Sequence, residues 1–480
     1  MTAYRDAMDA PVPELATRAA RCAERLRAAD DLLLASHIDA DGLTSAGIAS
    51  TALERAGIAH DVVFEKQLDR EAVERYAAAD YDAVFFTDFG SGQLDVITDY
   101  EAFTPVIADH HQPADAAIEF HLNPLLEGLD GGSELSGAGA SYCVARALEG
   151  DDGDNRDLAA LAVVGAVGDM QVVEGELIGA NAGIVAEGVE AGVLDASKDL
   201  AVFGTQTRPL PKLLAYASDV PIPGITGDRN GALRFLDGLD AELREDGEWK
   251  AWADLDTAAR RTVVSALVQR AMRTGVGADE IEALIGTTYT LCGEERGSEL
   301  RDASEFSTLL NATARYDRAA VGLAVCRGER GAPLDAARDL LREHRQTLAT
   351  GVDVVREVGV ERESHVQWFH AGDRLPETVV GIVAGMAMGE DGVEAGVPII
   401  AFAEKDDGGD DEPGVKVSMR GTPRLVERGL DLSTVAAEAA AAVGGDGGGH
   451  EVAAGATVPA GRETDFVAAA DAAVSEQLGS

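Results

Sequence analysis

Lysine is nearly absent from this chain. Of 480 residues only six are lysines, whereas Asp and Glu together number 85 and the formal net charge is −45. The acids are spread through amphipathic segments and 46% of the residues are hydrophobic, so we expect a folded protein with an acidic surface, not a disordered acidic tail. Because salt screens the self-repulsion of such a surface, we expect a halophilic source with high intracellular salt.

Cysteines and long apolar runs are also scarce. The four cysteines form no C-x-x-C pair and suggest no disulfide framework. No apolar run approaches the roughly 20 residues of a membrane span, and the first residues lack the features of a signal peptide. These absences predict a soluble, cytoplasmic protein without a membrane partner. A chain this acidic attracts nucleic acid only through local Arg clusters or metal ions.

Two α/β regions flank a mainly helical one. Over residues 1–200 short apolar strands alternate with amphipathic helices, which favours a mostly parallel, doubly wound sheet. Residues 201–325 are mainly helical, with breaks at prolines, and are expected to form a connecting arm. The α/β pattern returns over residues 326–480. The predicted fold class is therefore α/β, with two α/β lobes joined by a helical arm.

The main chemical signal lies where strands of the first region end. Asp109, His110 and His111 directly follow the apolar run Thr104–Ala108, and one carboxylate with two imidazoles suits Mn, Zn or Fe. In a parallel sheet, ligands bind beyond the carboxyl ends of the strands, so acids from distant segments are expected to meet there. Three other segments end in similar groups, which are His37, Asp39, Asp41, Asp88 and Asp169.

The acids among these residues also have simpler interpretations. Asp39 and Asp41 share a face if the strand continues, but an acidic turn that caps the next helix is the alternative. Asp88 is able to bridge two cations about 3.5–4 Å apart, as a two-metal site requires, although alone it reads equally well as a turn residue. For Asp169 the alternative is a polar residue at a helix end.

The two histidines are adjacent in sequence. On an extended segment His110 and His111 face opposite ways, so we expect one to bind metal and the other to face substrate or support the ligands. The simpler alternative is a pair of core or capping histidines.

The last region carries features that suit a phosphate. Consecutive glycines before His450 expose backbone N–H groups that are able to form an anion nest, with a flexible loop as the alternative. Upstream, Lys416, Ser418 and Arg420 alternate along a predicted strand, and Arg420 is able to fork onto phosphate oxygens. A solvated edge strand is the alternative there.

Together, His37-Ile38-Asp39-Ala40-Asp41-Gly42, Asp88, Asp109-His110-His111 and Gly168-Asp169 resemble the four motifs of the DHH phosphoesterase superfamily. The run Gly447-Gly448-Gly449-His450 resembles the glycine-rich motif of the accompanying DHHA1 domain, and Arg420 its substrate-binding Arg. In length and arm the chain is similar to archaeal RecJ-like nucleases, including those that join the replication complex as Cdc45 counterparts. The stretch Arg301–Tyr316 also looks typical of archaeal members.

The resemblance implies a catalytic DHH domain over residues 1–200, an arm over 201–325 and a substrate-binding DHHA1 domain over 326–480. It implies two Mn²⁺ ions, with Mg²⁺ or Co²⁺ as alternatives. His37 and Asp39 would hold one ion, Asp41, His110 and Asp169 the other, and Asp88 would bridge. The implied catalytic residues are His111, near the scissile phosphate, and Asp109, which orients ligands. The implied substrate-binding residues are Ser418, Arg420, Gly447, Gly448, Gly449 and His450.

The function that follows from the resemblance is a RecJ-like exonuclease. It would hydrolyse single-stranded DNA, or RNA, to mononucleotides in DNA repair or replication, with GINS and MCM proteins as candidate partners. One alternative is a phosphodiesterase for oligoribonucleotides or cyclic dinucleotides. Another is a non-catalytic Cdc45-like replication scaffold, which the intact set of motif acids disfavours.

Overall fold

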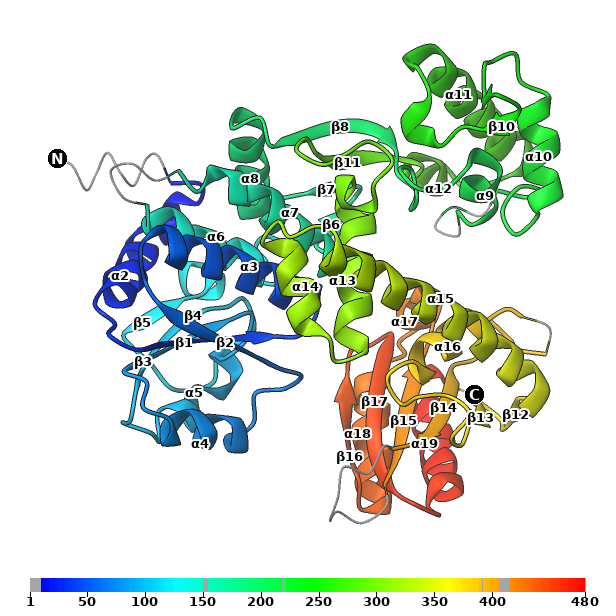
Figure 1. The fold of residues 1–480 in the computed structure, drawn as a ribbon. Coiled ribbons are helices and arrows are strands. Elements are labelled where there is room, and N and C mark those ends of the chain that lie inside the picture. The colour runs from blue at the N-terminus through cyan, green and yellow to red at the C-terminus, as the bar shows by residue number, and fades with distance from the viewer. Residues whose placement is uncertain are drawn as a thin grey trace. The chain divides into compact units, whose positions relative to one another are not determined.

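The computed structural model describes residues 10–149, 154–217, 220, 222–390, 392–405 and 414–479. The chain divides into two compact units, Met1–Asp339 and Leu340–Ser480. The first contains a parallel sheet of five strands and the second a mixed sheet of six (Figure 1). The predicted α/β fold with two lobes is therefore confirmed. Among the described residues, no helix has the length and apolar character needed to cross a membrane.

The first sheet has the strand order β2-β1-β3-β4-β5, with every neighbouring pair parallel. Its central strands are mostly apolar because parallel sheets are covered on both faces. Every residue of β3 is buried, as are the first five of β1. The strands are β1 (Leu32–His37), β2 (His60–Glu65), β3 (Ala83–Thr87), β4 (Thr104–Ala108) and β5 (Phe120–Leu122).

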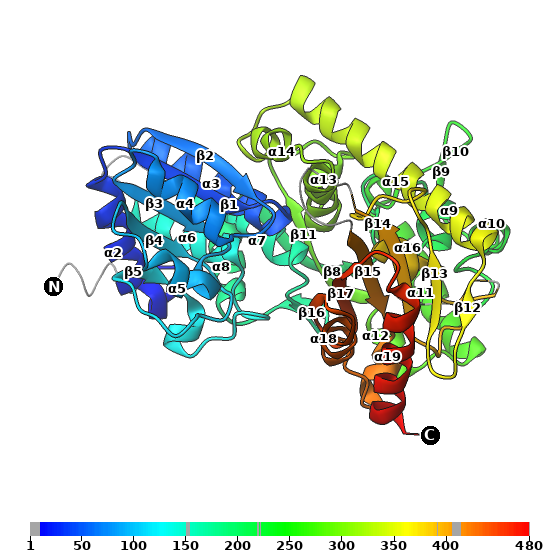
Figure 2. The ribbon, with the colours of Figure 1, turned by 90° about the horizontal axis from the view of Figure 1, so that it is seen from below.

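Helices cover both faces of this sheet (Figures 1 and 2). On one face, α4 (Arg70–Ala78) and α5 (Leu94–Ile97) pack on alternate strand residues such as Leu33, Val84 and Phe86. On the other, α2, α3 and α6 contact the strands, α7 packs on α3 and α6, and α8 packs on α7. Their bounds are α2 (Ala16–Arg27), α3 (Ala40–Arg55), α6 (Gly137–Ala147), α7 (Ala159–Gly168) and α8 (Gly179–Glu190).

A small, mainly helical subdomain is inserted after the first sheet. It lies between β8 (Leu194–Leu200) and β11 (Ile285–Leu291), which pair antiparallel, and it has its own core around Trp252 and Val263. The pair brings the two ends of the insertion together. The elements inside are α9 (Leu210–Ala215), α10 (Arg229–Asp237), β9 (Arg244–Glu245), β10 (Glu248–Trp249), α11 (Thr257–Thr274) and α12 (Ala278–Glu282).

The chain then returns to the first unit. Helix α13 (Ala303–Arg315) packs on α7 and α3, and α14 (Ala319–Cys326) packs on α3. The residues predicted to form one arm thus comprise an inserted subdomain and two helices that complete the first unit. The predicted boundaries at residues 200 and 325 stay predictions. Helix α15 (Ala332–Val358) contains the division between the units.

The second unit has the strand order β12-β13-β14-β15-β17-β16, in which only β13 and β14 are parallel. One apolar cluster joins α18 and α19 to the sheet, and another joins α15 and α16 to it. The strands are β12 (Glu361–Arg362), β13 (Gln367–His370), β14 (Ile399–Glu404), β15 (Gly414–Arg420), β16 (Asp446–Gly449) and β17 (Ala453–Pro459). The helices are α16 (Val380–Ala387), α17 (Pro423–Glu427), α18 (Leu432–Val443) and α19 (Glu463–Leu478).

Candidate metal centre

The first unit gathers the acids and histidines predicted from the strand ends into one cluster. The carboxyl ends of β1, β3 and β4 and the end of α7 deliver them. Within each of three groups, one nitrogen or oxygen of every residue lies within 4.8 Å of the others. The groups are His37 with Asp39 and Asp88, Asp41 with His110 and Asp169, and Asp88 with Asp109, His110 and His111.

Asp39 and Asp41 lie at the start of α3, because β1 ends at His37 and the helix begins at Ala40. Asp39 Oδ1 accepts a hydrogen bond from Gly42 N (3.0 Å), so the capping alternative holds for this oxygen. Asp41 is buried and accepts from the backbone N–H groups of Gly137 (2.7 Å) and Ala138 (3.0 Å) at the start of α6. Both carboxylates are thus fixed by backbone donors, not by a continuing strand.

Asp88 lies at the centre of the cluster. Its backbone is left-handed, with φ of 61°, and its side chain is 2% exposed. His37 Nδ1 is 3.5 Å from its Oδ2 and His110 Nε2 is 3.3 Å from its Oδ1. Oδ1 is buried and finds no donor in hydrogen-bonding geometry. A buried carboxylate oxygen without a donor is costly, and a bound cation would satisfy it.

The segment after β4 forms a turn around the Asp109 side chain. This buried carboxylate accepts hydrogen bonds from the backbone N–H groups of Ser91 (2.9 Å) and His110 (2.7 Å), and its Oδ1 lies 2.8 Å from His111 Nδ1. The expectation that the two histidines face opposite ways was wrong, since their ring centroids are 4.3 Å apart. His110 Nδ1 lies 2.6 Å from Gly131 O, which leaves Nε2 toward the acids.

The pKa values reflect the crowding of these groups. Burial raises the pKa of Asp41, with the charges of Asp88 and Asp169 adding to it, and burial raises the pKa of Asp169 to about 6. Burial opposes the charged forms of His37 and His110, but neighbouring carboxylates outweigh it and raise each pKa to about 11. Without cations the cluster therefore retains protons, and metal binding would displace them.

Glycines let the helices approach the carboxylates closely. A Cβ atom at Gly137 would lie 2.3 Å from Asp88 Oδ1, and one at Gly165 would lie 2.4 Å from Asp41 Oδ1. Helices α6 and α7 can line the cluster only because these positions carry no side chain. The oxygen and nitrogen donors, their proximity and the unpartnered oxygen of Asp88 together fit a pair of divalent cations.

Sequence reasoning missed three side chains that adjoin the cluster. Gln171 Nε2 donates to Asp169 Oδ2 (2.8 Å), and Asn311 Oδ1 accepts from Ala40 N (3.1 Å). Arg315 is one helical turn beyond Asn311 on α13; burial lowers its pKa, and the charge of Asp39 acts against that shift. The four-residue spacing of Asn311 and Arg315 on a predicted helix indicates that they share a face, but not what that face contacts, and Gln171 lies two residues after the predicted ligand Asp169.

The predicted substrate-binding residues lie in the second unit. Ser418 and Arg420 are on β15, under α16, since a Cβ at Gly381 would lie 2.9 Å from Ser418 Oγ and 2.5 Å from Arg420 Nη2. The glycine run forms β16, an edge strand paired with β17, and is not an open loop. His450 begins the turn into β17, with its N–H bonded to Ala453 O (2.8 Å).

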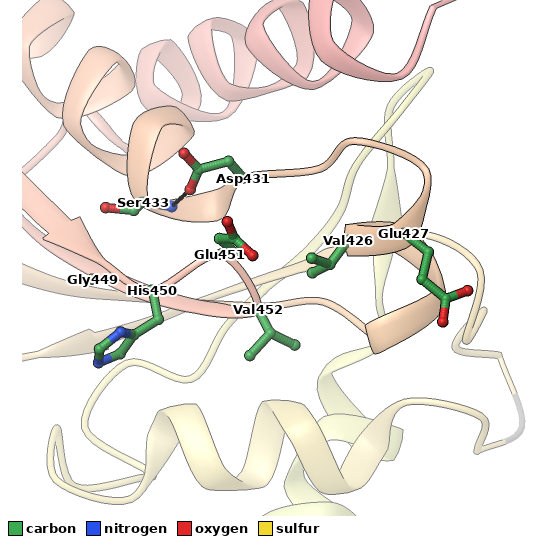
Figure 3. Close-up of a pocket in the computed structure, with 8 residues that line it drawn as sticks. All are labelled: Val426, Glu427, Asp431, Ser433, Gly449, His450, Glu451 and Val452. Carbon is green, nitrogen blue, oxygen red and sulfur yellow. Dashed lines mark hydrogen bonds between the residues drawn. The ribbon is translucent and has the colours of Figure 1, made fainter. Parts of the chain in front are cut away.

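A cavity of about 750 Å³ adjoins this turn (Figure 3). His450 and Val452 point to one side of the turn and Glu451 to the other, toward Asp431, whose carboxylate accepts from Ser433 N (2.9 Å). Ser418 and Arg420 do not line it. The lining residues are Val426, Glu427, Asp431, Ser433, Gly449, His450, Glu451 and Val452.

Sequence comparisons match two segments of the chain to known domains. Residues 202–285 match the DHH-CID domain, and residues 365–476 match the DHHA1 domain. An uncharacterised protein of Methanocaldococcus jannaschii is 29% identical over 453 residues, which cover 92% of this chain and 93% of that protein.

Solved structures share the fold. RecJ from Thermus thermophilus in complex with Mn²⁺ has a TM-score of 0.58 at 18% identity, over 97% of this chain and 55% of that one, so this chain spans about half of that RecJ. A manganese-bound exonuclease RecJ has a TM-score of 0.55 at 19% identity, over 96% of this chain and 94% of that one. CDC45 from Entamoeba histolytica has a TM-score of 0.61 at 12% identity, over 96% of this chain and 97% of that one. The chain therefore contains segments similar to the DHH-CID and DHHA1 domains, and its fold is similar to that of these solved structures.

Proposed function

We propose that the protein is a metal-dependent phosphodiesterase of the RecJ-like type, which hydrolyses single-stranded DNA or RNA to mononucleotides. The observation that carries the proposal is the buried ligand cluster centred on Asp88, with one carboxylate oxygen that lacks a donor. His37 and Asp39 would hold one Mn²⁺, and Asp41, His110 and Asp169 the other, with Asp88 between them; Mg²⁺ or Co²⁺ would serve as alternatives. Bound cations would supply an activated water and neutralise charge at phosphorus.

The protein's own residues would orient the substrate phosphate. The hydrogen bond with Asp109 raises the pKa of His111, which favours its cationic form, and the His111 side chain is 56% exposed. Arg315 adds a second positive charge beside Asp39. A polyanion needs such local cations on a chain with a net charge of −45.

The second unit would bind a terminal phosphate or the backbone of the strand. Arg420 supplies a guanidinium fork and Ser418 a hydroxyl on the same strand face. The edge strand β16 leaves one side of its backbone without a neighbouring strand, so backbone N–H groups there would be available. The residues proposed for this contact are Ser418, Arg420, Gly447, Gly448, Gly449 and His450.

The test is nucleotide release from 5′- and 3′-labelled single-stranded DNA and RNA, with Mn²⁺ in molar KCl. The matched variant is Asp88→Asn, because Asn tolerates the left-handed backbone of this position and the fold should survive. We expect Asp88→Asn to lower the rate at least about 100-fold. Release at the full rate by Asp88→Asn, or no release from any substrate by the unmodified protein, would contradict the proposal.

Two alternative functions predict different results in the same assay. A small-substrate phosphodiesterase would cleave dinucleotides or cyclic dinucleotides faster than 20-mers. A replication scaffold, favoured by the fold similarity to CDC45, would bind GINS or MCM proteins in high salt without cleaving any substrate. The intact ligand cluster supports the enzyme, and partner binding alongside cleavage would place the activity in DNA replication or repair.

A further inference from the structure

A second polar cavity lies in the first unit, where the β8–β11 pair meets the inserted subdomain. It has a volume of about 180 Å³, and none of the cluster residues lines it. Its walls come from β8, β11, the start of α11 and the loops beside them. The lining residues are Asp195, Ser197, Asp199, Thr205, Gln206, Trp252, Ala253, Arg260, Thr288, Thr290, Arg296, Arg301 and Asp302.

Three acids line this wall, and each accepts hydrogen bonds from the protein; Asp195 Oδ2 accepts from Ser197 Oγ (3.0 Å). Asp199 Oδ2 accepts from Trp252 Nε1 (3.1 Å) and Arg260 Nη1 (2.7 Å), and its Oδ1 accepts from a backbone N–H. Asp302 Oδ1 caps α13 by accepting from Ser304 N and Glu305 N, both at 3.0 Å. Each of the three carboxylates is therefore held by donors of the protein itself.

Several donors of the wall lack an acceptor. Arg260 Nε is buried without a hydrogen-bond partner. Among the described residues, no ion-pair partner is found for Arg296 and no acceptor for Gln206 Nε2, and Arg301 donates only to neutral backbone carbonyls. Donors without acceptors around one cavity call for an anionic ligand.

We propose that this cavity binds a phosphate oxyanion, held by Arg296 and Gln206 Nε2. Guanidinium groups match phosphate oxygens in geometry and charge. The volume suits one phosphate group with waters but not a whole nucleotide, so any sugar and base would remain outside. The phosphate would belong either to the backbone of a nucleic-acid strand or to a free small molecule.

The test is isothermal titration in the presence of EDTA, at fixed KCl, with inorganic phosphate, AMP and an eight-residue oligothymidylate. EDTA removes divalent ions, so binding here is measured independently of the candidate metal centre and of the proposed hydrolysis. The variants are Arg296→Ala, in an exposed loop, and Gln206→Glu, which keeps the acceptor oxygen that Gly297 N uses. The matched control is Arg261→Ala, an exposed Arg of α11 outside the cavity.

We expect each cavity variant to weaken binding roughly tenfold, as the loss of one charge-assisted hydrogen bond implies, while Arg261→Ala binds like the unmodified protein. Tighter binding of the oligonucleotide than of AMP, lost in the same variants, identifies a strand as the source of the phosphate. Equal affinity for phosphate, AMP and oligonucleotide identifies a free small molecule. No saturable binding of any probe, or equal weakening in the Arg261 control, overturns the proposal.

Discussion

Arg315 joins a site from a part of the chain more than a hundred residues beyond the last predicted ligand. Its guanidinium is half-buried beside Asp39, and among the described residues it has no ion-pair partner. We expect Arg315→Ala to lower kcat/KM about 10- to 100-fold through a lost contact to substrate phosphate, with Arg315→Lys intermediate. Kinetics on a labelled oligonucleotide check this, and Mn²⁺ affinity measured by calorimetry should not fall.

The matched control is Arg318→Ala, which removes an exposed positive charge three residues away. If Arg318→Ala slows cleavage as much as Arg315→Ala does, general electrostatic attraction explains the effect and the specific contact is refuted.

His121 couples the stability of the first unit to pH. Burial lowers its pKa to about 4, and Ser91 Oγ lies 2.9 Å from its Nε2. The unfolded chain binds a proton near pH 6.5 whereas the folded one does not, so this group's stability contribution is complete above that pH and is lost as pH falls toward 4. The loss is on the order of 3 kcal/mol.

We therefore expect His121→Gln to lose less stability than the unmodified protein between pH 7 and pH 4.5. Urea unfolding of the metal-free proteins at several pH values measures the difference. If the unfolding free energies of the two proteins fall by the same amount between pH 7 and pH 4.5, His121 is not the cause of the loss of stability in acid.

The strand-end residues could be predicted from sequence because topology alone brings the ends of parallel strands together. Asp88 and Asp109 follow buried strands directly, so their neighbourhood is fixed by the sheet. Asn311 and Arg315 could not be placed, since their positions depend on how α13 packs on α7 and α3, and sequence periodicity gives no information on which helices meet.

Helix α6 approaches the cluster through its first residue, Gly137. Ala normally stabilises a helix relative to Gly by about 0.5–1 kcal/mol, but a Cβ here would lie 2.3 Å from Asp88 Oδ1. We expect Gly137→Ala to displace the Asp88 carboxylate and to weaken Mn²⁺ binding about tenfold, with activity falling in parallel. Calorimetric titration of Mn²⁺ measures this change.

Gly92→Ala is the control for adding a methyl group in the same unit, because its nearest neighbour would be 3.8 Å away. Unchanged Mn²⁺ affinity in Gly137→Ala would show that the Asp88 carboxylate does not need its present position to bind the ion, and would contradict this prediction.

Strand β16 shows where pattern-based prediction fails for an element. A run of glycines has no side-chain alternation, so its sequence favours a loop. Two tertiary contacts decide otherwise: β16 pairs with β17 from Asp446 to Gly449, and α18 lies so close that a Cβ at Gly447 would be 2.7 Å from Ala436 O. Close helix packing, not backbone freedom, explains the glycine at this position.

The net charge of −45 governs the stability of the entire chain in solution. Exposed ion pairs such as Arg55–Asp157 (2.7 Å) contribute about 0–1 kcal/mol each and weaken with salt. The chain has 85 acidic residues but only 40 Lys and Arg, so repulsion among unpaired carboxylates outweighs the attraction within these ion pairs. Because salt screens this repulsion, salt should stabilise the fold. This balance is also what the expected halophilic source requires.

We expect the melting temperature of the metal-free protein to rise by about 10 °C or more between 0.05 M and 2 M KCl. The Debye length falls from about 10 Å at 0.1 M to about 3 Å at 1 M, so most of the gain should come below 1 M if screening is the cause. A steady rise that continues without saturation would point instead to salt exclusion from the surface. A melting temperature that is flat or falls with KCl would show that the acidic surface does not destabilise the fold at low salt, and the inference of a halophilic source would lose its physical basis.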